Sequence, residues 1–159
     1  LIGLVLHQQI PTEKAFSSPL VLRDRLGRDL DAADIAAMES EALEAVFKEK
    51  PALHRFPGSM AKRVQAVCEH IAEEYDGSVG KVWAGTISAD AMMERLLAIP
   101  GFGEYKARIY LGLLARRFSV RPAGWEEYLP TWPSIVDIES ADDLAQLKVR
   151  KKAWKESQG

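Results

Sequence analysis

Residues 99–108 constrain the fold of this chain most, because they separate two apolar stretches of helical spacing by a turn. Pro100 lacks a backbone N–H and disfavours the α conformation in the residue before it, so the first helix must end here. Gly101 and Gly103 permit a turn with positive φ and leave room for the backbone of another molecule. The sequence therefore predicts two helices joined by a tight hairpin, over about residues 91–117.

The start of the second helix of this hairpin has the properties of an anion site. The first N–H groups of a helix have no acceptor within it, and the helix dipole is positive at that end. Lys106 and Arg108 add positive charge in the first turn. A phosphate is the natural ligand of such a site, but an ordinary αα-hairpin with a glycine cap shows the same Pro-Gly-x-Gly pattern.

Three segments carry a resemblance to a known protein family. The sequence Ile-Pro-Gly-Phe-Gly at residues 99–103, followed by Ala107 and an apolar helix, resembles the helix-hairpin-helix of the HhH-GPD superfamily of base-excision DNA glycosylases. The glycine-containing turn and the Lys-Ala-like pair within residues 54–63, with Tyr-Asp-Gly at 75–77, are similar to a second family segment. The third is His-Gln-Gln at residues 7–9, within a predicted buried helix over residues 1–16.

The resemblance implies an all-α, two-lobed helical fold in which residues 1–159 form a single HhH-GPD domain. A chain of 159 residues with 47% apolar and 28% charged residues is typical of a folded soluble protein. The net charge of -2 means that DNA binding would need a local basic patch. The chain begins with Leu1 rather than Met, so we expect some N-terminal sequence to be missing. The capping box at residues 140–143 predicts a last helix.

The sequence and the resemblance also set expectations for cofactors and partners. Cys68 is the only cysteine, which excludes the four-cysteine iron–sulfur cluster that endonuclease III-like members often carry. We expect no cofactor or metal site, except that the resemblance implies a monovalent cation at the hairpin. The expected partner is double-stranded DNA with a damaged, mispaired or abasic nucleotide. The apolar start is too short to span a membrane, and we expect a monomer in the cytoplasm, associated with the nucleoid in a bacterium.

The resemblance assigns DNA contacts residue by residue. In the superfamily the N–H groups of the hairpin hold a phosphate beside the damaged nucleotide, and a glutamine fills the gap left by the flipped base. Gln9 matches that glutamine, although a glutamine in water at a helix end is the alternative. Arg55 and Lys62 could touch phosphates or be ordinary surface charges. The candidate DNA-binding residues are Gln8, Gln9, Arg55, Lys62, Gly101, Phe102, Gly103, Tyr105 and Lys106.

The proline-rich segment after the hairpin contains three aromatic residues, Trp125, Tyr128 and Trp132. Aromatic side chains at the mouth of a cleft could stack on an extruded base, so these are candidates for the base pocket. They could equally hold the segment against the core.

Cleavage of an N-glycosidic bond creates positive charge on the sugar, which a carboxylate stabilises. The superfamily places an Asp about 20 residues beyond the hairpin, but residues 120–125 contain no carboxylate. Asp137, in an apolar-Val-Asp context, is the favoured catalytic candidate, and Glu126 and Glu127 are the alternatives. A carboxylate that leads into a helix would also explain Asp137 without catalysis.

Tyr105 occupies the position at which bifunctional members carry a nucleophilic Lys, so no lyase activity is expected. The sequence therefore favours a monofunctional DNA glycosylase, a hydrolase that acts on a flipped base. The alternative is a catalytically inactive sensor of the same fold that binds damaged DNA.

Overall fold

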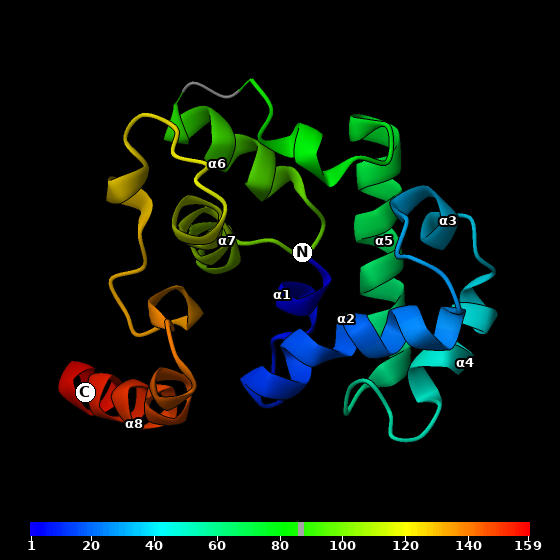
Figure 1. Ribbon diagram of the computed structural model, residues 1–159, viewed down its shortest axis with the longest axis horizontal. Helices are drawn as coiled ribbons and strands as arrows, with labels where there is room; N and C mark the ends of the chain where they lie inside the picture. Colours follow the sequence, from blue (N-terminus) through cyan, green and yellow to red (C-terminus); the bar gives the residue numbers. More distant parts are fainter. Residues whose placement is uncertain (86–87) are drawn as a thin grey trace. The chain divides into compact units, whose positions relative to one another are not determined.

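The computed structural model describes residues 1–85 and 88–159, and these residues form helices and no β-strand (Figure 1). The all-α fold class is thereby confirmed. The chain divides into two compact units, Leu1–Ala84 with Ala98–Phe102 and Gly85–Leu97 with Gly103–Gly159. Among residues 1–85 and 88–159, none of the helices combines the length and the hydrophobicity of a membrane span.

The first unit is built around its longest helix, α5 (Pro57–Tyr75). α1, α3 and α4 pack against α5, and α2 packs against α1 and α4. The other helices of this unit are α1 (Ile2–Leu6), α2 (Thr12–Leu26), α3 (Ala32–Ala36), α4 (Ser40–Lys48) and the 3₁₀ turn η1 (Val79–Val82). Its core contains the fully buried side chains Leu4, Leu6, Leu22, Ile35, Leu43, Phe47, Val64 and Ile71.

The sequence of α5 explains why it is the central helix. Pro57 suits a first helical position, where its missing N–H costs nothing. The buried residues Val64, Cys68 and Ile71 recur at helical spacing and form one apolar face. Each fully buried aliphatic side chain contributes about 1.5–3 kcal/mol relative to exposure. Burial raises the pKa of the Cys68 thiol to about 12, so this cysteine is a core residue rather than a nucleophile.

The N-terminal helix is shorter than the sequence predicts. α1 ends at Leu6 and α2 begins at Thr12, so the prediction of one helix over residues 1–16 is wrong. Pro11 is the cause, because it lacks an N–H and disfavours the α conformation in the residue before it. Gln8 and Gln9 consequently lie in a connecting turn and not within a helix.

The second unit contains the hairpin helices and the C-terminal helix. These elements are α6 (Ala89–Ala98), α7 (Glu104–Arg117), the 3₁₀ turns η2 (Trp125–Tyr128) and η3 (Ile135–Asp137), and α8 (Ala141–Gln158). α7 packs against η2 and η3, and α8 packs against η3. The predicted capping box begins α8: the N–H of Asp143 donates to Ser140 Oγ (3.1 Å), and the N–H of Ser140 donates to the Asp143 carboxylate (3.0 Å).

The packing of η3 on α7 depends on a close approach at Gly112. A Cβ atom on Gly112 would lie 2.9 and 3.0 Å from the two methyl carbons of Val136 and 3.3 Å from a methyl carbon of Leu129. Real Cβ atoms almost never come this close to a carbon atom, and the short, branched Val136 cannot swing away. Gly112 is therefore required by packing, although glycine weakens a helix.

We expect Gly112→Ala to destabilise the protein. Alanine gains about 1 kcal/mol of helix propensity, but overpacking a well-filled contact costs about 1–3 kcal/mol. The melting temperature should fall by a few degrees in a thermal denaturation experiment. The double variant Gly112→Ala, Val136→Ala is the control, because it removes the clashing methyl groups. If the double variant is no more stable than Val136→Ala alone, the clash does not explain the glycine.

Candidate nucleic-acid interface

The predicted hairpin turn joins α6 to α7. α6 ends at Ala98, and the N–H of Phe102 donates to the carbonyl of Ile99 (3.0 Å), which closes the turn. Ile99 and Phe102 are buried, so their side chains pack within the protein and do not face a partner. Gly101 has φ 76°, a conformation that only glycine adopts without strain.

Gly103 directly precedes α7, and neither its conformation nor its surroundings require a glycine. Its φ of -87° and ψ of 178° suit any residue, and a Cβ atom there would meet nothing within 4 Å. Hydrogen bonding within α7 starts with the N–H of Ala107, which donates to the carbonyl of Gly103 (3.0 Å). Ser, Asp or Asn at this position would cap the helix better. With glycine at the cap position, the start of α7 has no capping hydrogen bond from a side chain at residue 103, and the dipole is positive at that end.

Arg108, in the first turns of α7, is held by neighbours within the second unit. Its Nε donates to the carboxylate of Glu104 (2.8 Å), and its Nη1 donates to the carbonyl of Glu127 (3.3 Å). The guanidinium carbon lies 5.3 Å from the centre of the Tyr128 ring. Tyr128 in turn donates its O–H to Asp90 (2.6 Å), and this hydrogen bond raises the pKa of Tyr128. Arg108 therefore links η2 to the start of α7.

A shallow groove beside this network carries negative charge. Because three of the side chains that line it are carboxylates, the groove does not suit a phosphate. It is lined by Asp90, Met93, Glu94, Leu97, Glu104 and Tyr128.

The aromatic candidates occupy two different environments. Trp132 stacks on Tyr105, with ring centres 5.1 Å apart and ring planes 12° from parallel. Partial burial raises the pKa of Tyr105. Trp125 lies in η2 under the guanidinium of Arg121, at 5.8 Å, and Tyr128 belongs to the Arg108 network. The structure thus places Trp132 on Tyr105 and Tyr128 on Arg108, both near the start of α7, whereas Trp125 contacts Arg121 after the end of that helix.

The two glutamines of the connecting turn differ in their surroundings. The side-chain amide of Gln8 donates to the carbonyl of Val5 (3.0 Å) and contacts Met60 Sδ (3.5 Å), while its Oε1 accepts from Arg63 (3.3 Å). Gln9 is exposed, and its φ is 55°, which is unusual for a residue other than glycine. Gln8 is anchored to the protein, whereas the side chain of Gln9 is presented to solvent.

The start of α5 gathers the other basic candidates. Arg55, Lys62 and Lys48 surround a shallow groove, into which the Glu44 carboxylate also projects. The Glu44 oxygen lies 2.8 Å from the position a Cβ would take on Gly58. Lys48 pairs with Glu44 and lowers its pKa. Lys48 was not a sequence candidate, because it lies in an acidic helix and no local pattern links it to α5.

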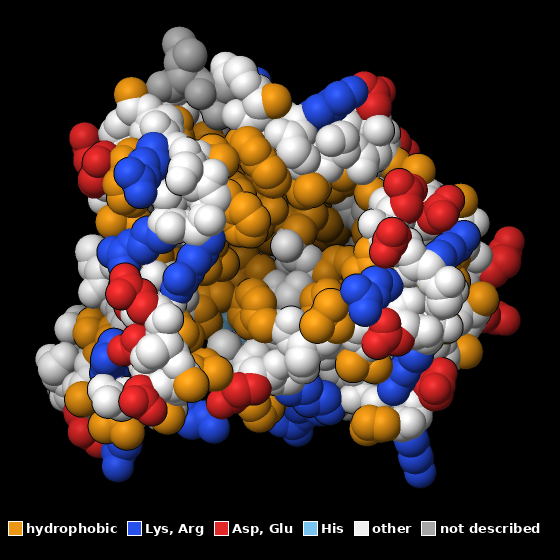
Figure 2. Space-filling view, viewed as in Figure 1, with side chains coloured by type: hydrophobic (Ala, Val, Ile, Leu, Met, Phe, Trp, Pro, Cys, Tyr) orange, Lys and Arg blue, Asp and Glu red, His pale blue; other side chains and the backbone are white. Residues whose placement is uncertain are grey.

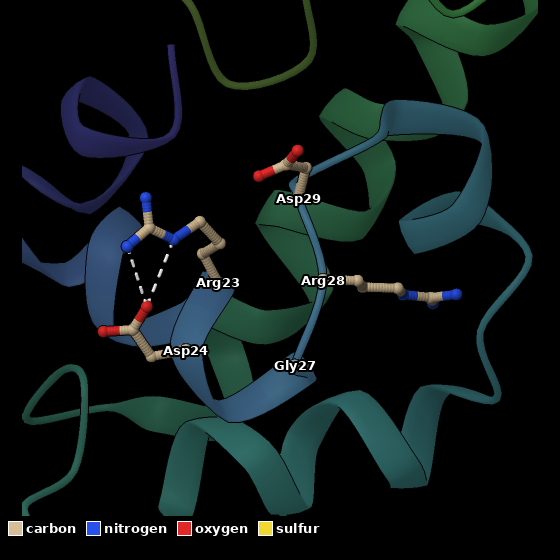
Figure 3. Close-up of a pocket in the computed structure, with 5 residues that line it drawn as sticks. All are labelled: Arg23, Asp24, Gly27, Arg28 and Asp29. Atoms are coloured by element: carbon tan, nitrogen blue, oxygen red, sulfur yellow. Dashed lines mark hydrogen bonds and ion pairs between the residues drawn. The ribbon is translucent and has the colours of Figure 1, made fainter.

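The described surface around α2, α3 and α4 carries charges of both signs. Figure 2 shows Asp and Glu side chains, mixed with Lys and Arg, over the part of the first unit that holds α3 and α4. A hollow at the end of α2 is also lined by charges of both signs (Figure 3). Arg23 donates to Asp24 from Nε and Nη2 (3.1 and 2.9 Å), and Arg28 points away toward its partner Asp34 (3.2 Å). No cluster of His, Cys, Asp or Glu suited to a metal ion occurs in residues 1–85 and 88–159.

Asp137, the favoured catalytic candidate, is the last residue of η3 and completes a capping box there. One carboxylate oxygen accepts the N–H of Ser134 (3.1 Å), and the other lies 3.4 Å from Nη1 of Arg116. The Ser134 hydroxyl accepts the N–H of Val136 (3.2 Å), which completes the cap. Both oxygens of Asp137 therefore have partners in the protein.

Asp137 also lies beside a part of α7 that is remote from the start of that helix. Its neighbour Val136 packs on Gly112, which follows Tyr105 by two turns of the helix, about 10 Å. Asp137 itself contacts Arg116, one further turn away. By contrast, Arg108 binds the backbone of Glu127 close to the start of α7. Glu126 and Glu127 are exposed in η2.

One comparison with known proteins identifies a family for this chain. The family model described as HhH-GPD superfamily base excision DNA repair protein matches residues 2–153. No curated protein and no solved structure gives a significant match. The chain belongs to the HhH-GPD superfamily of base excision DNA repair proteins.

Proposed function

We propose that this protein is a monofunctional DNA glycosylase that binds duplex DNA through its hairpin and hydrolyses the bond to a damaged or mispaired base. The observation that supports a DNA contact at the hairpin is the presence of glycine at position 103. The protein's own fold does not require a glycine there, yet a side chain would cover the N–H groups at the start of α7. A phosphate that approaches this helix end is the simplest reason for leaving it bare.

Gln9 is proposed to fill the gap that the flipped base leaves in the duplex. It is exposed, and its left-handed backbone is the kind of local strain that collects at functional positions. The amide can both donate to and accept from the orphaned base, and it carries no charge to desolvate. Gln8 has the supporting role, because its side chain is already bonded to α1 and α5.

For base release we propose a carboxylate of η2, Glu126 or Glu127. A phosphate held at the start of α7 puts the attached sugar within a few ångströms of that helix end. Asp137 lies at least two turns along α7 and serves as a cap, so the geometry favours the glutamates. The carboxylate would stabilise the positive charge that develops on the sugar. Tyr105 has no amine to form a Schiff base, so the reaction would stop at the abasic site.

A second candidate function is recognition of damaged DNA without catalysis. The observation that favours it is the double engagement of Asp137 by Ser134 and Arg116, together with the high exposure of the η2 glutamates. Neither arrangement is the buried, preorganised carboxylate that strong electrostatic catalysis requires. Binding with no base release would assign the protein to this class.

The binding part of the proposal is tested by fluorescence anisotropy with matched duplexes that contain, or lack, a stable abasic analogue. The wild-type protein should prefer the abasic duplex, and its affinity for both should fall steeply with salt because phosphate contacts release counterions. Gln9→Ala should weaken abasic binding by about tenfold, roughly 1.4 kcal/mol, and undamaged binding much less. An equal loss on both duplexes would make Gln9 a general contact.

A further inference from the structure

His54 is buried, 1% exposed, and lies between α4 and α5 with a backbone group at each ring nitrogen. Its Nδ1 lies 3.0 Å from the N–H of Phe56, and its Nε2 lies 2.8 Å from the carbonyl of Gln8. An N–H can only donate and a carbonyl can only accept, so Nδ1 is bare and Nε2 carries the proton. The two partners thereby select the neutral Nε2–H tautomer.

The carbonyl that His54 holds belongs to the peptide unit that enters Gln9. The carbonyl of Gln8 and the nitrogen of Gln9 share one rigid plane, because the peptide bond does not rotate. The other side of Gln8 is also fixed, since its N–H donates to the carbonyl of Leu6 (2.7 Å). With this plane held, the direction of the Gln9 side chain is set by φ and ψ of Gln9. The value of φ is 55°.

The backbone strain at Gln9 competes with the hydrogen bond from His54 to the Gln8 carbonyl. A left-handed conformation is unfavourable for a residue other than glycine, so Gln9 alone would relax to negative φ. Rotating the peptide away would leave the buried Nε2–H of His54 without an acceptor, and this penalty is comparable to the backbone strain. The hydrogen bond from His54 is thus large enough to offset the strain at Gln9.

We propose that His54 is a positioning residue, whose Nε2–H holds the Gln8 carbonyl and thereby keeps Gln9 in the conformation that projects its amide outward. The inference rests on the proposed role of Gln9 in the duplex. It also couples that residue to the start of α5, because the same ring accepts the N–H of Phe56, the cap residue of that helix.

Two substitutions of His54 by amide residues test its two hydrogen bonds one at a time. The side-chain nitrogen of Gln in His54→Gln can replace Nε2 and keep the Gln8 carbonyl bound. The side-chain oxygen of Asn in His54→Asn can replace Nδ1 and keep the Phe56 N–H bound, but it cannot reach Gln8. The ratio of affinities for abasic and undamaged duplexes should stay near the wild-type value in His54→Gln. In His54→Asn the ratio should fall about tenfold, toward that of Gln9→Ala.

A double-mutant cycle that combines His54→Asn with Gln9→Ala distinguishes a positioning role of His54 from a merely structural one. If His54 acts through Gln9, His54→Asn should change the ratio little further once Gln9 is alanine. A structural role would instead lower thermal stability and both affinities together, and leave the ratio unchanged. An unchanged ratio in His54→Asn, an equal loss in both amide variants, or additivity with Gln9→Ala would overturn the proposal.

A second measurement does not depend on DNA. The ¹⁵N shifts of the His54 ring should show a protonated Nε2 and a bare Nδ1, and the opposite tautomer would contradict the assignment. A wild-type protein that shows this tautomer but binds both duplexes equally would refute the role of Gln9 and, with it, the positioning role. A wild-type protein that discriminates, with His54→Asn unaffected, would refute the positioning role alone.

Discussion

Gly103→Asp should stabilise the folded protein and nearly eliminate DNA binding. The backbone of Gly103 already has the conformation of a cap residue, and no atom lies near the position of a new Cβ. An aspartate there can accept the first N–H groups of α7 and suits the helix dipole, for a gain of about 0.5–1 kcal/mol. The same carboxylate would occupy and repel the phosphate site, so affinity should fall on the order of 100-fold.

Gly103→Asn is the matched control, because it has the size and capping ability of aspartate without the charge. It should stabilise the protein to a similar extent and weaken DNA binding by less than aspartate does. Thermal denaturation and anisotropy titrations at one salt concentration give both quantities. If Gly103→Asp is more stable than the wild type and binds duplex DNA equally well, the hairpin does not contact a phosphate.

The largest effect on catalysis is expected at η2. Glu126→Gln and Glu127→Gln each keep the size of the side chain and remove its charge. Base release should fall by about 100-fold or more in at least one of them, because the charge on the sugar loses its stabilising partner. Affinity for abasic duplex should not fall, since the carboxylates do not attract phosphates. Single-turnover base release and anisotropy separate these two outcomes.

Asp137→Asn is the comparison for this experiment. The asparagine oxygen can still accept the N–H of Ser134, while the ion pair with Arg116 is lost. We therefore expect base release close to the wild-type rate and a modest loss of thermal stability. A variant that is stable and binds DNA but no longer releases base would return the catalytic role to Asp137.

The hairpin could be predicted from the sequence because local rules determine it. Pro100 and Gly101 favour a turn through their own backbone chemistry, and the capping residues of α8 act within four positions of each other. The apolar pattern of the first residues predicts a longer N-terminal helix than the structure contains. Pro11 prevents one helix from continuing through residues 1–16.

The site could be predicted only in part, because much of it depends on contacts between distant residues. Asp137 shows the ambiguity: a carboxylate that caps a helix and one that precedes a catalytic helix look alike in sequence. His54 had no signal at all, since its acceptor is the backbone of Gln8 and any residue would supply that carbonyl. The positive φ predicted for the glycines of the hairpin is confirmed at Gly101 and wrong at Gly103, where φ is -87° and packing does not demand a glycine.

The central claim is tested most directly by base release from a panel of duplexes, each with one damaged or mispaired base, followed by alkali to cut at abasic sites. We predict alkali-dependent cleavage of at least one duplex, no cleavage without alkali, and no covalent adduct with borohydride. The last two results follow from Tyr105, which cannot form a Schiff base. Tight binding with no alkali-labile product from any duplex would contradict the glycosylase assignment and support a non-catalytic sensor.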